Sequence, residues 1–222
     1  MKVAILLTVL MLFTVTVQAE DEIKYSGALK VWDAQASQPG SHNSATETSA
    51  ASSAGNISLT AKKSDYFVTA STLLPATYNF GTDNFLQRHD LDIAAGWRFY
   101  DIFSALIGQK QLTYFAPGSS GNQNIRATYL GLSAAKLISD KSFLYGTATY
   151  SIKASNSLNQ PDSRYKQNFA TYEFGYGYAM DKTTQLTVGY RAQQYYTKDN
   201  TFGYSETDKI TGFIFGANFN FN

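Results

Sequence analysis

The residues that could perform acid–base chemistry are few, because the 222-residue chain contains two histidines and no cysteine. His42 lies in a Ser/Ala/Thr-rich segment and is interpreted as a solvated loop residue. His89 lies in the run Arg88-His89-Asp90-Leu91-Asp92, the best candidate for a catalytic cluster. In an extended strand His89 and Asp90 point to opposite faces, so a coupled pair would need a bulge. The sequence therefore predicts no enzyme, and a hydrolase based on this cluster remains the third alternative.

Cofactor and nucleic-acid binding find no support in the motifs. No metal-ligand spacing, phosphate-binding loop or nucleophile elbow occurs, so neither a cofactor nor a metal is expected. Without cysteine, a disulfide scaffold and a cysteine-ligated metal site are excluded. Removing an N-terminal leader that contains Lys2 leaves 18 − 1 = 17 basic residues against 17 acidic ones. A neutral chain of this kind has no basic surface that would indicate nucleic acid.

The other candidates for a site are charged residues on one side of a period-two pattern. We predict that they face the interior of the folded chain together. They are Lys24, Lys30, Lys62, Asp90, Asp92, Arg98, Lys110, Lys153, Glu173 and Arg191. Buried charges must be paired or hydrated, because an isolated charge in an apolar interior is very costly.

The elements that would position these charges are β-strands. The last segment is the clearest, because apolar residues there alternate with mostly small or amide residues. The apolar set is Phe213, Phe215, Ala217, Phe219 and Phe221, and the opposite set is Gly212, Ile214, Gly216, Asn218 and Asn220. With 16 Tyr, 15 Phe and 16 Gly, and charged residues at 16% against roughly 25% in soluble proteins, much of the surface is expected not to face water.

The same alternation recurs along the chain and predicts about ten strands, an even number as in bacterial barrels. The predicted spans are 22–33, 56–63, 65–74, 88–98, 102–115, 124–137, 142–153, 167–179, 185–196 and 208–221. An eight-stranded count stays open, because alternation is weakest in 65–74 and 102–115. No stretch after the leader approaches about 20 apolar residues, which excludes a helical membrane protein.

The connections alternate in length. Tight polar turns are predicted at 63–65, 99–101, 139–141 and 181–183, and longer loops at 34–55, 75–87, 116–123, 154–166 and 197–207. Short periplasmic turns and long external loops would place both termini in the periplasm. Aromatic residues near strand ends are predicted to form girdles at the two membrane interfaces. They are Trp32, Tyr66, Trp97, Phe99, Tyr100, Phe115, Tyr178, Tyr195 and Tyr196.

Residues 1–19 have the pattern of a cleaved signal peptide. Lys2 is followed by an apolar stretch from Val3 to Val17 and by the small-residue ending Val17-Gln18-Ala19. Residues 20–222 then form one domain.

With the period-two repeats and the closing Phe213, Phe215, Phe219 and Phe221, the chain resembles the small Gram-negative outer-membrane β-barrels. The resemblance implies an antiparallel up-and-down barrel in the bacterial outer membrane. It also implies that the C-terminal strand is recognised by the barrel-assembly machinery, although here Asn222 follows the last aromatic residue.

A secreted β-sandwich or a lipocalin-like barrel is the soluble alternative, since such folds have equal periodicity. The long aromatic face, the small and charged residues opposite it and the alternating loop lengths argue against it. For the membrane barrel, the interior charges have two interpretations. They form either a plug or a basic lumen that favours anions. Side chains just fill the interior of a barrel of about eight strands, whereas barrels of about 16–18 strands enclose an open channel, so about ten strands favour the plug.

The sequence thus predicts a structural or surface-interaction protein that acts through its external loops. Expected partners are outer-membrane lipid, lipopolysaccharide and an extracellular or surface partner. The loop residues proposed for such contacts are Tyr78, Phe80, Phe85, Tyr165, Phe202 and Tyr204. A narrow anion-preferring, porin-like channel for small solutes is the alternative.

Overall fold

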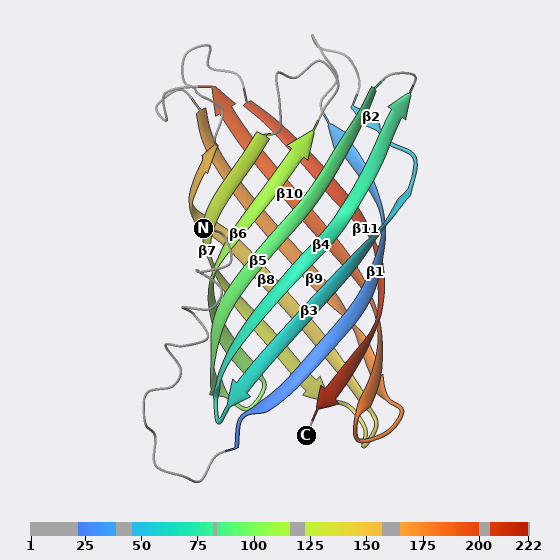
Figure 1. Cartoon of the computed structure of the whole chain (residues 1–222), viewed down its shortest axis with the longest axis vertical. Coiled ribbons are helices and arrows are strands. Elements are labelled where there is room, and N and C mark those ends of the chain that lie inside the picture. The colour runs from blue at the N-terminus through green and yellow to red at the C-terminus, as the bar shows by residue number, and fades with distance from the viewer. Residues whose placement is uncertain are drawn as a thin grey trace.

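The computed structural model is a closed antiparallel β-barrel (Figure 1), and it describes residues 22–38, 46–81, 84–115, 123–156, 165–199 and 205–221. The signal peptide predicted at 1–19 lies outside the described residues. The strands are β1 (Lys24–Gln38), β2 (Glu47–Thr48), β3 (Ser52–Lys63), β4 (Tyr66–Gly81), β5 (Asn84–Tyr100), β6 (Phe103–Phe115), β7 (Gln123–Leu137), β8 (Ser142–Asn156), β9 (Tyr165–Ala179), β10 (Thr184–Asp199) and β11 (Ser205–Phe221).

Each long strand pairs with the next one along the chain, and β11 pairs with β1 to close the barrel. The closing register runs from Tyr25 opposite Phe221 to Ser37 opposite Lys209. Strand β2 has two residues and adds only a short pairing to β1. The ten long strands confirm the predicted number and correct the eight-stranded alternative. Within the described residues, no helix has the length and hydropathy of a membrane span.

The alternation of side chains follows the predicted phase. On β11, Phe213 and Phe215 expose 59% and 50% of their surface on the outside, whereas Ile214 between them exposes 1% and points into the barrel. The outward positions of the other strands are likewise rich in large apolar side chains such as Leu59, Leu132 and Phe174. A closed barrel leaves no strand edge unpaired, and a broad apolar exterior of this kind is suited to lipid.

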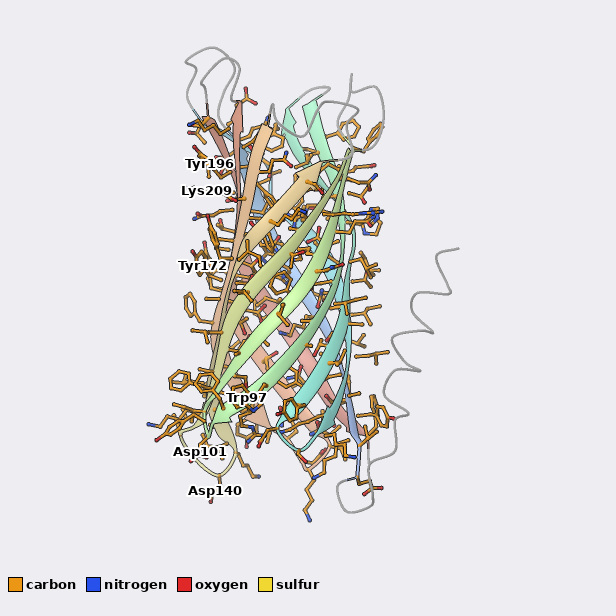
Figure 2. The ribbon with its side chains drawn as sticks, turned by 90° about the vertical axis from the view of Figure 1, so that its left-hand side faces the viewer. Trp97, Asp101, Asp140, Tyr172, Tyr196 and Lys209 are labelled. Carbon is orange, nitrogen blue, oxygen red and sulfur yellow. The ribbon has the colours of Figure 1, made fainter. Side chains whose placement is uncertain are left out.

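Four tight turns, which join β3 to β4, β5 to β6, β7 to β8 and β9 to β10, lie together at one end of the barrel. In the last of them Asp181 accepts hydrogen bonds from the amides of Thr183 and Thr184, each 2.7 Å long, and from the Thr183 hydroxyl. We call this end the turn end and the opposite one the loop end. Figure 2 shows Asp101 and Asp140 at the turn end and Tyr196 and Lys209 at the loop end. Strand β1 begins and β11 ends at the turn end.

Several strands extend further toward the loop end than predicted. The segments expected as loops at 34–55 and 75–87 contain the end of β1, the start of β3, the end of β4 and the start of β5. Ala34, Ala36 and Ala54 are buried there because small residues with period two still present one face to the interior. The prediction of a loop at 34–55 is therefore wrong for the residues that form β1 and β3.

Candidate functional site

The candidate site is the polar network that fills the centre of the barrel. Arg88 on β5 is its largest member, and only 1% of its surface is exposed. Its Nε donates to Asp90 Oδ1 at 2.7 Å and its Nη2 donates to Asp90 Oδ2 at 2.5 Å. The same Nη2 donates to Gln193 Oε1 and, at 2.8 Å, to Tyr195 Oη, both on β10. Arg88 therefore bridges strands on two sides of the lumen.

Lys110 on β6 extends this group. Asp92 and Lys110 are direct partners in the β5–β6 register, and Lys110 Nζ lies 3.4 Å from Asp92 Oδ2 and 3.8 Å from Asp90 Oδ2. Tyr129 on β7 donates from its hydroxyl to Asp92 Oδ1 at 2.6 Å. The ring of Tyr129 lies over Gly108, where a Cβ would collide with it. A glycine at this position is what allows the phenol to reach the carboxylate.

A second group joins β1, β9 and β10. Lys30 Nζ donates to Glu173 Oε1 at 2.8 Å, and Arg191 Nη1 lies 3.9 Å from Glu173 Oε2. Glu173 and Arg191 face each other in the β9–β10 register. The Arg191 guanidinium also lies over the ring of Trp32, with 5.1 Å from Cζ to the ring centroid, and Lys30 Nζ lies 5.5 Å from the centroid of Tyr145. Such cation–π contacts stabilise charges that are withdrawn from water.

Aromatic rings fill the space beside the charges toward the loop end. Tyr114 and Tyr195 meet edge to face at 5.7 Å between centroids, and Phe169 stacks on Tyr195 at 6.0 Å. Tyr129 meets Phe169 edge to face at 5.9 Å, and Lys110 Nζ lies 5.3 Å from the Phe169 centroid. Charges and rings thus occupy the same cross-section of the lumen.

Cavities lie at both ends of the barrel. A cavity of about 150 Å³ opens toward the loop end, with Phe80, Leu86, Tyr114 and Tyr195 among its walls. A cavity of about 420 Å³ opens toward the turn end, and Lys62, Arg98, Asp101 and Tyr145 are among the residues that line it. The Arg88 and Lys110 side chains themselves line neither cavity, because they are packed between the two ends.

Six of the ten predicted interior charges meet in the network, namely Lys30, Asp90, Asp92, Lys110, Glu173 and Arg191. Three others lie at the turn end. Lys24 is exposed opposite Lys62, and Arg98 Nε lies 3.8 Å from Asp65 Oδ1.

The prediction for Lys153 is wrong, because this side chain is exposed on the outside. The β7–β8 register shifts there, so that Thr128 faces Lys153 while Tyr129 faces Ser151. Ile152 is the extra residue of a β-bulge, and one extra residue turns the following side chain to the other face.

Several aromatic predictions are also wrong. Trp32 and Tyr195, expected in the girdles, are buried inside the barrel, and Tyr78, expected in an external loop, is fully buried. The other predicted girdle residues are exposed on the outer surface: Tyr66, Trp97, Phe99, Tyr100, Phe115, Tyr178 and Tyr196. Of the predicted contact residues, Phe80 packs partly against the apolar core and Phe85 lies 6.2 Å from Phe115 between ring centroids. Phe202, Tyr204 and the Tyr165 side chain lie outside the described part.

Sequence reasoning missed Arg88 as a member of the network, although its position two residues before Asp90 signals a shared face. It also missed Gln193, since an amide carries no charge signal. His89 is exposed outside while Asp90 is buried inside, and the β5–β6 register is regular at this point. The two residues therefore do not form a coupled pair. Among the described residues, no three acidic or histidine side chains come together as metal ligands.

Known structures resemble this one in fold. The outer-membrane protease OmpT from Escherichia coli matches with a TM-score of 0.50 at 12% identity, over 94% of this chain and 99% of that chain. Neisserial surface protein A matches with a TM-score of 0.41 at 15% identity, over 89% of this chain and 97% of that chain. The translocator domain of the autotransporter NalP from Neisseria meningitidis matches with a TM-score of 0.47 at 10% identity, over 88% of this chain and 88% of that chain. No family model and no curated protein matches the sequence. The chain therefore has the fold of the Gram-negative outer-membrane β-barrels.

Proposed function

We propose that this barrel is a closed support for interactions at its loop end and does not conduct solutes through its centre. The observation that carries the proposal is the filled cross-section, in which Arg88, Asp90, Lys110 and Asp92 are bonded to one another and to aromatic side chains. Opening a path would separate buried charges from their partners. Removing one partner of a buried ion pair costs about 3–5 kcal/mol, so spontaneous opening is rare.

Interactions at the loop end are supported by the exposed side chains near it. Phe115 and Tyr196 are exposed there, and Arg126 on β7 and Lys153 on β8 lie close together on the outer face. Basic side chains beside an apolar exterior suit the phosphate groups of lipopolysaccharide as well as outer-membrane lipid. Contacts with an extracellular or surface partner would use the same end, since loops on a rigid barrel commonly carry function.

For the orientation we propose that the turn end lies in the periplasm and the loop end outside the cell. The short turns and the position of the β1 and β11 ends support this arrangement. Strand β11, with Phe213, Phe215, Phe219 and Phe221 on its outer phase, would serve as the signal for the barrel-assembly machinery. We also propose that the chain is not an enzyme, which the opposite directions of His89 and Asp90 support.

Recording from refolded protein in a planar bilayer tests the closed barrel. The wild-type protein is expected to give no steady current at moderate voltage, because the central charges are paired and packed. A stepwise steady conductance from purified barrels would contradict the proposal. Heat-dependent migration on gels, in which a folded barrel runs differently from the boiled chain, verifies that the inserted protein is folded.

A narrow anion channel is the second candidate, and the basic excess in the lumen favours it. The central network has the four cations Lys30, Arg88, Lys110 and Arg191 against three carboxylates. Under this alternative the bilayer shows small anion-selective currents, which weaken in Arg191→Gln and at high salt. A cation-selective current from the wild type would contradict both candidates, since neither a basic nor a sealed lumen produces it.

A further inference from the structure

Seven buried donor groups have no hydrogen-bond acceptor among the described residues, and five of them lie near the Arg88 and Arg191 side chains. These five are Trp32 Nε1, Tyr78 Oη, Arg88 Nη1, Arg191 Nε and Gln193 Nε2. Trp32, Tyr78 and Gln193 expose none of their surface and Arg88 exposes 1%. Leaving one such donor buried without an acceptor costs about 1–3 kcal/mol, and native proteins rarely gather several. The group therefore indicates a ligand that accepts hydrogen bonds.

The five side chains surround one region of the lumen. Arg191 lies over the Trp32 ring at 5.1 Å, and Arg88 donates to Gln193 Oε1. Trp32 and Tyr78 pack in the same apolar cluster, and Tyr78 lies within electrostatic range of both guanidinium groups. Arg191 and Gln193 are two residues apart on β10, so they share the inward face. Donors from β1, β4, β5 and β10 therefore face the same region.

The charge of the surrounding network identifies the ligand class. Four cations oppose three carboxylates, and each carboxylate is already bonded: Asp90 to Arg88, Asp92 to Tyr129 and Glu173 to Lys30. One positive charge is left without a counter-charge in the network. A neutral acceptor would satisfy the donors but would leave this charge uncompensated in an apolar surrounding.

We propose that these donors bind one small monovalent anion, such as a halide, as a constituent of the plug. The anion accepts hydrogen bonds from the two guanidinium groups, the indole, the phenol and the amide, and it makes the network neutral. The apolar side chains Ile210 and Ile214 are buried in the same cluster as Trp32 and Tyr78, which favours a compact ion over a larger one. The loop-end cavity, which Tyr195 lines next to Arg88, is the route of entry. This inference goes beyond the proposed closed barrel. Anion binding is measured by fluorescence and conduction by bilayer recording, so each proposal can fail without the other.

The two tryptophans of the chain provide the test. Trp32 lies at the proposed site, whereas Trp97 exposes 49% of its surface on the outside near the turn end. In Trp97→Phe the fluorescence comes from Trp32 alone, and bromide quenches an indole that it contacts. Sodium bromide is titrated into folded protein in detergent, with sodium gluconate keeping the ionic strength constant. Quenching of Trp32 is expected to saturate. In Trp32→Phe, which reports Trp97, quenching should rise linearly as for random collisions.

The variant Gln193→Glu tests whether the anion binds at the proposed site. The change is isosteric, keeps an acceptor for Arg88 and replaces the free Nε2 donor by a carboxylate oxygen. It is made in the Trp97→Phe background and should weaken bromide binding about tenfold or more, since a charged hydrogen bond is lost and repulsion is added. The matched control is Gln87→Glu, which adds the same charge at an exposed position and should bind as the parent does.

Two outcomes would overturn the proposal. Absent or linear quenching of Trp32 in the parent protein would mean that the donors are only hydrated. Saturable quenching that Gln193→Glu leaves unchanged would mean that the anion binds elsewhere. If Gln193→Glu does not fold, the urea midpoint of the wild type in chloride and in gluconate replaces it, and equal midpoints count against the site. A current in the bilayer with saturable quenching would refute the closed barrel and leave the anion site standing.

Discussion

Individual carboxylates inside the barrel differ in how many cations depend on them. Glu173 is the only carboxylate paired with Lys30 and Arg191 within the described residues, whereas Lys110 has both Asp90 and Asp92. Loss of Glu173 therefore leaves two cations without a counter-charge, and loss of Asp92 leaves Lys110 with Asp90. The stability lost when one of these carboxylates is removed therefore depends on the number of cations that it pairs with as well as on its burial.

Glu173→Gln is predicted to destabilise the barrel by about 1–3 kcal/mol, because it leaves Lys30 and Arg191 without their counter-charge. The cost is smaller than for a fully buried pair, since these side chains keep some contact with solvent. Urea-dependent unfolding from lipid vesicles, followed by tryptophan fluorescence, measures the change. Asp140→Asn, which removes an exposed carboxylate in a turn, is the control and should leave the midpoint unchanged. Equal midpoints for wild type and Glu173→Gln would show that water, and not the ion pair, stabilises these charges.

Each strand of the barrel has two faces with different surroundings, and β11 shows this most clearly. Phe215 is exposed on the outside between Val31 of β1 and Val188 of β10, its register partners. Asn218 lies on the opposite phase of the same strand and faces inward. The effect of a substitution on β11 is therefore expected to depend on whether the side chain faces lipid or the lumen.

Phe215→Lys is predicted to destabilise the folded barrel by about 2–4 kcal/mol if this position lies near the membrane midplane, because it places an ammonium in hydrocarbon. Asn218→Lys should cost less, since the added charge enters the polar lumen. The folded fraction after transfer from urea into vesicles, read from heat-dependent gel migration, compares the two. Equal folded fractions would contradict the assigned faces.

The whole barrel has two dissimilar ends, which makes its orientation testable. The natural chain has no cysteine, so one introduced thiol reports a single position. Lys198 lies near the loop end of β10, and Asp140 lies in a turn at the opposite end (Figure 2). Both side chains are exposed, so reactivity depends on which compartment each end meets.

Intact cells are treated with a maleimide carried on a polyethylene glycol too large to pass general porins. Lys198→Cys is predicted to react, and Asp140→Cys should react only after the outer membrane is permeabilised. The mass increase of the chain on a gel measures the reaction. The reverse pattern would invert the proposed orientation, and protection of both positions in intact cells would place the loop end elsewhere than the cell surface.

The ten strands, their order and the outward face of β11 could be predicted from the sequence alone. A strand that faces lipid on one side must alternate its side chains with period two, so the pattern is local and readable. Six interior charges followed from the same alternation.

Only the tertiary structure decided the rest. The outward direction of Lys153 depends on a bulge at Ile152, which exists only in the pairing with β7. The partners of Arg88 on β10 are 105 and 107 residues away, so closure of the barrel brings them together. Trp32 and Tyr195 carry rings that suit a membrane interface or an interior equally well, and their place is decided by which face the register turns inward. Strand identity is encoded locally, whereas the contents of the lumen depend on contacts between strands that are distant in the chain.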